Sequence, residues 1–201
     1  MKKNLLALAF LVGLLTCCKS EDAPIKPVKP TDPGSINKEY MSRAETTFAN
    51  IFKYYWSDKV RMMFGSYPNT LGTPQEPSSP DYDSHAYLWG LGSVVSAFNA
   101  IVQNTDNVDF RMTYESRLKE TLLKYYNTTK EPMCFGCFVN PHDQRLYDDA
   151  IWVGIDLADL YSKTKDSWYL DYAKSVWNFV LSGKDDELGG GVYWDENAKD
   201  S

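Results

Sequence analysis

Two kinds of helical segment alternate along the sequence, and this alternation constrains the fold more than any other feature. In one kind, apolar residues repeat at helical spacing on a single face; in the other, they cover almost the whole circumference. A helix that is apolar all round is buried, whereas a one-faced helix lies outside. The one-faced segments are 37–57, 110–126 and 167–182, and the segments apolar nearly all round are 84–103 and 148–162.

The two inner segments also begin alike, with Leu88-Trp89 in the first and Ile151-Trp152 in the second. This similarity indicates an internal repeat of about sixty residues per helical pair. Stacked helical hairpins with inner and outer members are typical of an α/α toroid or an α-solenoid. The sequence therefore predicts an all-α fold, and Asp83 is a plausible N-cap of the first inner helix.

The connections between these helices differ in length at the two ends of the array. The inner-to-outer connections, 104–109 and 163–166, are short. The outer-to-inner connections, 58–83, 127–147 and a third that begins at Gly183, are long. Because long loops in a compact domain usually carry function, we expect the functional site where the inner helices begin.

Two adjacent carboxylates, Asp148 and Asp149, lie at the start of the second inner helix. One interpretation is structural, because Asp is favoured at helix N-caps and in the first turn. The other is catalytic, because glycoside hydrolysis needs two carboxyl groups in different protonation states, about 5–5.5 Å apart in retaining enzymes. Two neighbouring negative charges and burial both raise a carboxyl pKa, so such a pair can supply the two states.

The sequence around this pair resembles glycoside hydrolase family 76, the bacterial endo-α-1,6-mannanases and their relatives. The resemblance is carried by 147–152 and 156–161, by Gly189-Gly190-Gly191 followed by aromatic residues, and more weakly by 87–100. It implies an (α/α)6 barrel and retaining hydrolysis of α-1,6-mannosidic bonds in a mannan polysaccharide. It also implies Asp148 as nucleophile and Asp149 as acid/base.

An (α/α)6 barrel of six helical hairpins needs roughly 300 residues or more at ordinary helix and loop lengths. The 201 residues supply five helices. We therefore expect about the first half of the barrel, as the N-terminal part of a longer enzyme. A non-catalytic glycan-binding protein and another α/α-barrel sugar enzyme are alternative functions.

Several further residues are candidates for substrate binding. The glycines permit tight turns and close approach of the backbone to a ligand, and the aromatic residues after them offer faces for a sugar; an exposed hairpin turn is the alternative. Trp89 and Trp152 either line a sugar groove or belong to the core. His85 either binds a sugar hydroxyl or is a capping or exposed histidine. The full candidate set is His85, Trp89, Trp152, Gly190, Gly191, Tyr193 and Trp194.

Cys134 and Cys137 form one CxxC motif without a second pair, and even with His142 the pattern lacks a fourth zinc ligand. The sequence therefore predicts no metal site, and the two thiols could form a local disulfide outside the cytoplasm. It holds no GxSxG, Walker or dinucleotide fingerprint, and no cofactor is expected.

The first residues resemble an N-terminal targeting signal. Lys2 and Lys3 precede an apolar stretch, 5–15, that is too short to span a bilayer, and Cys17-Cys18 follows. This resembles a lipoprotein signal peptide over 1–17 with Cys18 as the lipidated residue; a plain secretory signal is the alternative.

We interpret 18–36 as the lipidated cysteine and a Pro-rich tether, and 37–201 as the barrel domain. The expected location is an outer-membrane lipoprotein, at the cell surface or the periplasmic face, attached to the membrane through its N-terminal lipid. With 21 basic against 27 acidic residues and a net charge of −6, the chain lacks the basic surface that nucleic-acid binding requires. The sequence makes no prediction of oligomeric state.

Overall fold

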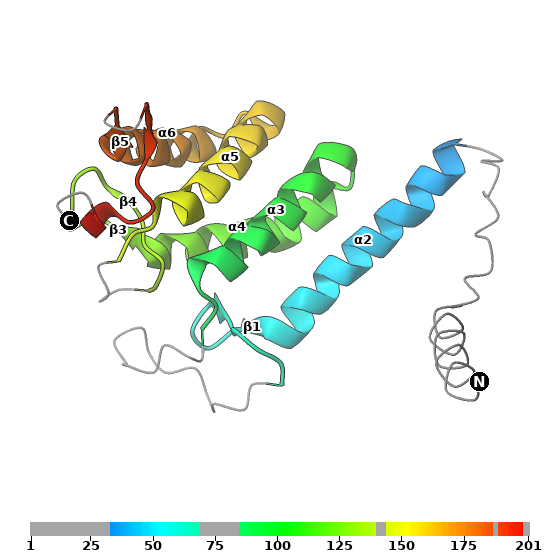
Figure 1. The fold of residues 1–201 in the computed structure, drawn as a ribbon. Helices are drawn as coiled ribbons and strands as arrows, with labels where there is room; N and C mark the ends of the chain where they lie inside the picture. The colour runs from blue at the N-terminus through cyan, green and yellow to red at the C-terminus, as the bar shows by residue number, and fades with distance from the viewer. Residues whose placement is uncertain (1–32, 69–84, 140–143, 187–188, 199–201) are drawn as a thin grey trace, which may run out of the picture. The chain divides into compact units, whose positions relative to one another are not determined.

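Five α-helices dominate the residues that the computed structural model describes, which are 33–68, 85–139, 144–186 and 189–198. Asn37–Ser201 forms one compact unit. Figure 1 shows the helices as successive coiled ribbons. In chain order they are α2 (Pro33–Tyr55), α3 (Leu88–Asn104), α4 (Val108–Tyr125), α5 (Tyr147–Thr164) and α6 (Ser167–Ser182).

The predicted helices are confirmed, and the bounds of α6 are those expected from the sequence. The start of α3 is a correction, because the helix begins at Leu88 with Tyr87 as an extended N-cap. Asp83, the predicted cap, lies outside the described residues. His85 forms a β-bridge with Phe64, and this pairing keeps the chain extended before the helix.

Three short antiparallel hairpins follow the three outer helices, and the sequence offered a hairpin only for the third, as the alternative at the glycine stretch. They pair β1 (Trp56–Ser57) with β2 (Met62–Met63), β3 (Tyr126–Asn127) with β4 (Cys134–Phe135), and β5 (Lys184–Asp185) with β6 (Gly191–Val192). Strands of two residues are too short to show a period of two in the sequence. Two hairpins lie in the outer-to-inner connections, and the third lies in the segment that begins at Gly183, after α6. The repeat predicted from the helices therefore extends to the loops.

The inner helices α3 and α5 pack against each other, and α5 also packs along α6. Leu91 and Val95 of α3 and Val153 and Leu157 of α5 are buried. Gly154 permits the close approach of α5 to α6, because a Cβ there would lie 2.6 Å from a methyl carbon of Val176. An aromatic cluster joins α2, α3 and α4 through Phe48, Phe52, Phe98, Phe110 and Tyr114.

The expectation that the inner helices are buried all round is wrong for one face. Trp89 of α3 is 55% exposed, Trp152 of α5 is 53% exposed, and Ile155 is also exposed. No other described helix covers this face. The apolar circumference therefore divides into a packed part and an open part, and the open part holds the tryptophans.

A final short 3-10 helix, η2 (Glu196–Ala198), follows β6 and returns to the start of α5. Among the described residues, no helix has the length and the apolar character needed to cross a membrane.

Candidate active site

The start of α5 holds the aspartate pair. Its N-cap, Leu146, makes no side-chain capping bond. Instead Asp148 accepts a hydrogen bond on Oδ1 from the backbone N–H of Asp149, at 2.9 Å. The capping interpretation is therefore correct only in part: Asp148 meets an N–H group of the first turn without being the cap residue.

The second oxygen of Asp148 faces an aromatic residue from a distant part of the chain. Trp194 donates a hydrogen bond from its indole Nε1 to Oδ2 of Asp148, at 3.2 Å. This contact joins two of the features singled out in the sequence, the Asp pair and the aromatic stretch after the glycines. Asp148 is partly exposed and can be reached by a ligand.

Asp149 has a different environment from its neighbour, since it is buried with 8% of its surface exposed. Burial raises the pKa of its carboxyl, the negative charge of Asp148 raises it further, and a hydrogen bond from the thiol of Cys137 opposes them. The pair therefore combines a partly exposed carboxyl with a buried one that favours its protonated form. This is the asymmetry that acid/base chemistry on a glycosidic bond needs.

A cavity of about 310 Å³ opens beside Asp149, between α3 and α5. Its walls are apolar and aromatic, with two serine hydroxyls of α3 among them. Trp89 and Trp152 face it from the two inner helices, so the interpretation of these residues as core is wrong. The lining residues are Leu88, Trp89, Gly92, Ser93, Ser96, Asp149 and Trp152.

A second hollow, of about 340 Å³, adjoins the first because Trp89 lines both. It also contains His85, Tyr87, Gly65, Ser66 and Gly90. Burial, and after it the positive charge of Lys124, lowers the pKa of His85, which favours its neutral imidazole. His85 thus lies in a hollow beside the cavity of the Asp pair rather than at a helix cap.

The glycine stretch forms a turn, which is the alternative interpretation of its sequence. Gly189 and Gly190 have φ of 91° and 96°, in the left-handed region that favours glycine. Gly191 begins β6, and a Cβ there would meet nothing within 4 Å. Of the two predicted glycines, Gly190 therefore shapes the turn and Gly191 begins the strand, and a Cβ at either position would lie beyond 4 Å from the Asp pair.

The aromatic residues after the turn divide between two roles. Tyr193 is partly buried against the core, and its hydroxyl donates a hydrogen bond to Asp185 of β5. Trp194 is exposed, and its backbone oxygen accepts a hydrogen bond from the N–H of Tyr147 at 3.0 Å. Only Trp194 is brought to the Asp pair.

A buried arginine, which the sequence analysis did not single out, holds this arrangement together. The guanidinium of Arg145 donates to both carboxylate oxygens of Glu196, at 2.9 and 2.5 Å, and to the carbonyl of Pro132 at 2.7 Å. It also lies over the ring of Phe179. Its position three residues before Asp148 was the available signal. Arg145 ties η2, and with it Trp194, to the start of α5.

Asp156 of α5 accepts hydrogen bonds from Ser96 and from Asn99 of α3, the latter at 2.9 Å. It is buried, and burial raises its pKa, while both hydrogen bonds oppose the rise. Asp159 is exposed. Asp156 is therefore a buried, hydrogen-bonded acid that joins the two inner helices, and Ser96 connects it to the cavity beside Asp149.

The model of glycosyl hydrolase family 76 matches residues 39–201 of this chain. The chain belongs to family 76. This confirms the resemblance found in the sequence, and the helices with their structural relatives confirm an all-α fold that forms part of an α/α barrel. No curated protein matches the sequence.

Three solved structures of Bacteroides thetaiotaomicron proteins are similar to this family 76 chain. A family 76 mannosidase from strain VPI-5482 is 26% identical with a TM-score of 0.67, over 79% of this chain and 42% of that one. A family 76 hydrolase from a bovine strain is 27% identical with a TM-score of 0.65, over 78% and 32%. A family 76 α-mannanase is 20% identical with a TM-score of 0.63, over 82% and 43%, and at that identity shows the fold alone.

The family 76 chain thus spans less than half the length of these relatives. Its family is one of glycosyl hydrolases. The family match leaves the linkage, the roles of the two aspartates and the activity of this chain itself to the proposals below.

Cys134 and Cys137 are both buried free thiols, so the local disulfide considered from the sequence is not formed. Burial raises the pKa of each thiol to about 12. No three potential ligands gather into a metal site within the described ranges, and His142 lies outside them.

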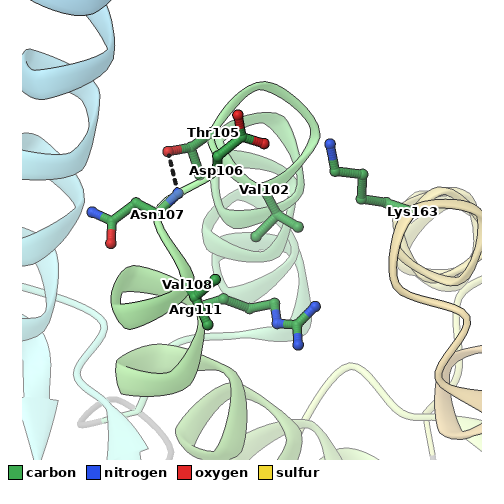
Figure 2. Close-up of a pocket in the computed structure, with 7 residues that line it drawn as sticks. All are labelled: Val102, Thr105, Asp106, Asn107, Val108, Arg111 and Lys163. Atoms are coloured by element: carbon green, nitrogen blue, oxygen red, sulfur yellow. Dashed lines mark hydrogen bonds between the residues drawn. The ribbon is translucent and has the colours of Figure 1, made fainter.

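A third hollow, of about 200 Å³, lies at the opposite end of the helices (Figure 2). It is formed where α3 ends, α4 begins and α5 ends, and Arg111 and Lys163 contribute its positive charge. Thr105 accepts a hydrogen bond from the N–H of Asn107 at 3.1 Å, the dashed line in Figure 2. Its polar side chains serve the helix connections, and none of the predicted site residues lies there. The lining residues are Val102, Thr105, Asp106, Asn107, Val108, Arg111 and Lys163.

Proposed function

We propose that this family 76 chain carries the catalytic apparatus of a retaining glycosidase that cleaves α-1,6-mannosidic bonds in mannan. The observation that carries the proposal is the unequal environment of two adjacent carboxyl groups, Asp148 partly exposed and Asp149 buried beside an aromatic cavity. Retaining hydrolysis uses one ionised carboxylate as nucleophile and one protonated carboxyl as acid.

In the proposed first step, the carboxylate of Asp148 attacks the anomeric carbon of a mannosyl unit. The glycosidic C–O bond breaks as Asp149 gives its proton to the leaving oxygen. In the second step, a water molecule gives a proton to Asp149, and the oxygen of that water attacks the anomeric carbon. The bond between the anomeric carbon and Asp148 then breaks, and the Asp148 carboxylate is released. The two displacements together leave the anomeric configuration unchanged.

The substrate site of this proposal consists of the two adjoining hollows. Trp89 and Trp152 offer exposed aromatic faces beside Asp149, and a sugar ring can lie against such faces through its apolar C–H groups. The neutral imidazole of His85 can exchange hydrogen bonds with sugar hydroxyls in the second hollow. Trp194 would hold Asp148 through its indole N–H.

The test is the release of reducing ends from linear α-1,6-mannan, with Asp148→Asn and Asp159→Asn in parallel. Asp148→Asn removes the nucleophile and should abolish release, whereas Asp159 is exposed on the same helix and its variant should match the wild type. Proton NMR of the first product should show the α-anomer. An initial β-product would contradict retention, and equal activity of both variants would contradict the role of Asp148.

The exposed tryptophans also favour a second candidate, glycan binding without turnover. Calorimetric titration with α-1,6-linked mannotetraose distinguishes the two. A cooperatively folded chain that binds the tetrasaccharide and releases no product would support binding alone. Failure to bind, combined with cleavage of α-1,2- or α-1,3-linked arms, would instead assign a different linkage.

We further propose that the chain is lipidated on Cys18 and held at the outer membrane, which would place the site near extracellular or periplasmic mannan. The support is the lipobox-like sequence and the Pro-rich segment after it. Metabolic labelling with a fatty acid should mark the wild type and Cys17→Ala but not Cys18→Ala. Labelling of Cys18→Ala and loss from Cys17→Ala would move the site to Cys17.

A further inference from the structure

Two serine hydroxyls of α3 line the cavity beside Asp149, and each gives its proton to another part of the protein. Ser96 donates to Oδ2 of Asp156 on α5, and Ser93 donates to the backbone carbonyl of Trp89 at 3.3 Å. A hydroxyl has one proton to donate and two lone pairs that accept. Because the proton is already used, only the lone pairs are left for a ligand. The two hydroxyls therefore face the cavity as hydrogen-bond acceptors.

A chain of side-chain amides behind Asp156 fixes the direction of these bonds. Gln103 donates from Nε2 to the backbone carbonyl of Asp159 at 2.8 Å, and from the same nitrogen to Oδ1 of Asn99 at 3.1 Å. Since a backbone carbonyl only accepts, the amide of Gln103 has one orientation, and this turns Nδ2 of Asn99 toward Asp156. Asn99 donates from that nitrogen to Oδ1 of Asp156 at 2.9 Å. One oxygen of Asp156 is thus fixed as an acceptor.

The other oxygen of Asp156 accepts from Ser96, and the packing of the two inner helices holds this pair in place. Asp156 is buried, and the hydrogen bonds on its two oxygens favour the ionised carboxyl, which only accepts. Gly92 lies one helical turn before Ser96 and packs against α5, because a Cβ there would lie 3.7 Å from a methyl carbon of Val153. The orientation of the Ser96 hydroxyl therefore follows from the contact between α3 and α5.

We propose that Ser96 is a specificity-determining residue that accepts a hydrogen bond from one sugar hydroxyl, and that Asp156 is the positioning residue that fixes this polarity. A sugar hydroxyl in the cavity can donate its proton to Ser96, whereas an ether oxygen or a fluorine at the same place would face lone pairs only. A site built to hydrogen-bond a hydroxyl discriminates against an analogue that lacks it. This inference deepens the proposed function and rests on it in placing a mannosyl ring in the cavity.

The charges around the cavity favour the same kind of ligand. Among the described residues that line it, none is a Lys, an Arg or a His, and Asp149 contributes a carboxyl. Asp156 adds a second carboxyl behind Ser96. An anionic substituent on the sugar would meet carboxyl groups and lone pairs without a compensating cation from these residues. The lining therefore suits a neutral, donating hydroxyl and disfavours a carboxylate or a phosphate on the same ring.

The experiment compares the binding of methyl α-mannoside with that of analogues in which one hydroxyl at a time is replaced by fluorine, by NMR titration of the full chain at pH 7. Fluorine is close to a hydroxyl in size and has no proton to donate. One analogue should bind the wild type about fivefold more weakly than the parent, because one hydrogen bond is lost. In Ser96→Ala this ratio of dissociation constants should fall to about one, since the acceptor is gone.

Ser162→Ala is the matched control for this variant. Ser162 is an exposed serine of α5 outside the cavity, and its hydroxyl donates to the carbonyl of Asp159 at 2.7 Å. The control should therefore keep the wild-type ratio. A wild-type ratio of about one for every analogue, a ratio that Ser96→Ala leaves unchanged, or no binding of the parent by the wild type would each overturn the inference.

Asp156→Asn tests the positioning role. The oxygen of the new amide accepts from Asn99, so its N–H groups face Ser96 and donate to it, and Ser96 turns its own proton toward the cavity. The ratio for the same analogue should fall toward one, while Asp159→Asn, at an exposed position of the same helix, should keep the wild-type ratio. A role of Asp156 confined to holding the helices would weaken parent and analogue alike, and an unchanged ratio would overturn its positioning role.

A measurement on the wild type decides if Asp156→Asn fails to unfold cooperatively. The Ser96 hydroxyl proton, held by Asp156, should exchange slowly with water and give an NMR signal that Ser96→Ala removes; absence of this signal would overturn the positioning role. The binding ratios are independent of turnover. The expected ratios in a chain that releases no reducing ends would keep the inference and remove the proposed hydrolysis, whereas hydrolysis with an unchanged ratio in Ser96→Ala would do the reverse.

Discussion

The two ends of the helical array use their polar residues in different ways. At the end in Figure 2, the outer helices begin with side-chain caps: Asn107 accepts from the N–H of Phe110 at 3.1 Å, and Asp166 accepts from that of Trp168 at 3.0 Å. At the other end, the N-caps of the inner helices α3 and α5 are Tyr87 and Leu146, which make no side-chain capping bond. Polar groups at one end stabilise the helices, and at the other they face a cavity.

The difference follows from the connections. In a short loop between two helices, side chains within a few residues can satisfy the free N–H groups of the next helix. A long connection with a β-hairpin satisfies its backbone through strand pairing, and it brings in residues from a distance. Trp194 and Glu196 reach the start of α5 in this way. The end with hairpins can therefore keep a carboxyl pair for chemistry.

The largest structural effect should come from the buried ion pair at the hairpin end. Arg145→Met removes a buried guanidinium and leaves the largely buried Glu196 carboxylate with Lys130, at 3.6 Å, as its remaining cation, which should cost about 3 kcal/mol of unfolding free energy. Arg111→Met at the opposite end loses a longer, half-exposed pair with Glu115 and should cost below about 1 kcal/mol. Urea unfolding of the two variants measures both. Equal losses would contradict the comparison.

A smaller loss of unfolding free energy should follow when a methyl group is added at Gly183, next to the buried ring of Tyr147. A Cβ at Gly183 would lie 2.3 Å from the ring of Tyr147, which is buried and stacked on Phe179, so Gly183→Ala should cost about 1–3 kcal/mol. Gly191→Ala is the matched control, because its Cβ meets nothing within 4 Å. Thermal unfolding of the two variants checks the difference. A Gly183→Ala protein as stable as Gly191→Ala would show that Tyr147 can move freely.

The open face of the inner helices should matter for ligand binding more than for stability. Trp89→Ala and Trp152→Ala should each weaken binding of an α-1,6-mannooligosaccharide about tenfold, with little change in unfolding temperature. Trp177→Ala removes a tryptophan exposed to a similar degree on α6, outside the cavity, and should leave affinity unchanged. Calorimetric titration measures all three. Loss of affinity in Trp177→Ala would place the ligand elsewhere.

The smallest effect on stability should come from Asp166 at the capped end, and this effect should depend on pH. A hydrogen bond from Lys119, and another from the N–H of Trp168, lower the pKa of Asp166 from its ordinary value of 3.8. A lowered folded-state pKa adds stability above the ordinary value, and this is lost as pH falls through the folded-state pKa. Asp166→Asn keeps a capping oxygen and loses the ion pair, so it should cost about 0.5–1 kcal/mol at pH 7, because the pair is partly exposed. The cost should decrease as the pH falls through the folded-state pKa of Asp166. A cost that is unchanged at pH 2 would mean that the cap, not the charge, is responsible.

Much of this comparison was predictable from sequence, because it depends on helical periodicity. The alternation of inner and outer helices, the position of the Asp pair and the gathering of long connections were all visible. The first two hairpins were not, since strands of two residues leave no periodic signal, whereas the glycines offered the third as an alternative. Arg145 and Ser96 were missed as site residues because their partners, Glu196 and Asp156, are set by packing between distant segments.

The tryptophans show a different limit. Periodicity identifies which residues of a helix are apolar, but not which part of an apolar circumference is covered by neighbours. Trp89 and Trp152 therefore could be read either as core or as groove, and only the arrangement of α3 and α5 placed them on an open face.

The most direct test of the account compares one carboxylate from each end in the hydrolysis of α-1,6-mannan. Asp149→Asn removes the buried acid at the hairpin end and should reduce kcat/KM by about 10²–10⁴-fold. Asp106→Asn removes an exposed acid from the hollow in Figure 2 and should match the wild-type rate. Full activity in Asp149→Asn, or a comparable loss in Asp106→Asn, would contradict the claim that the chemistry belongs to the end where the inner helices begin.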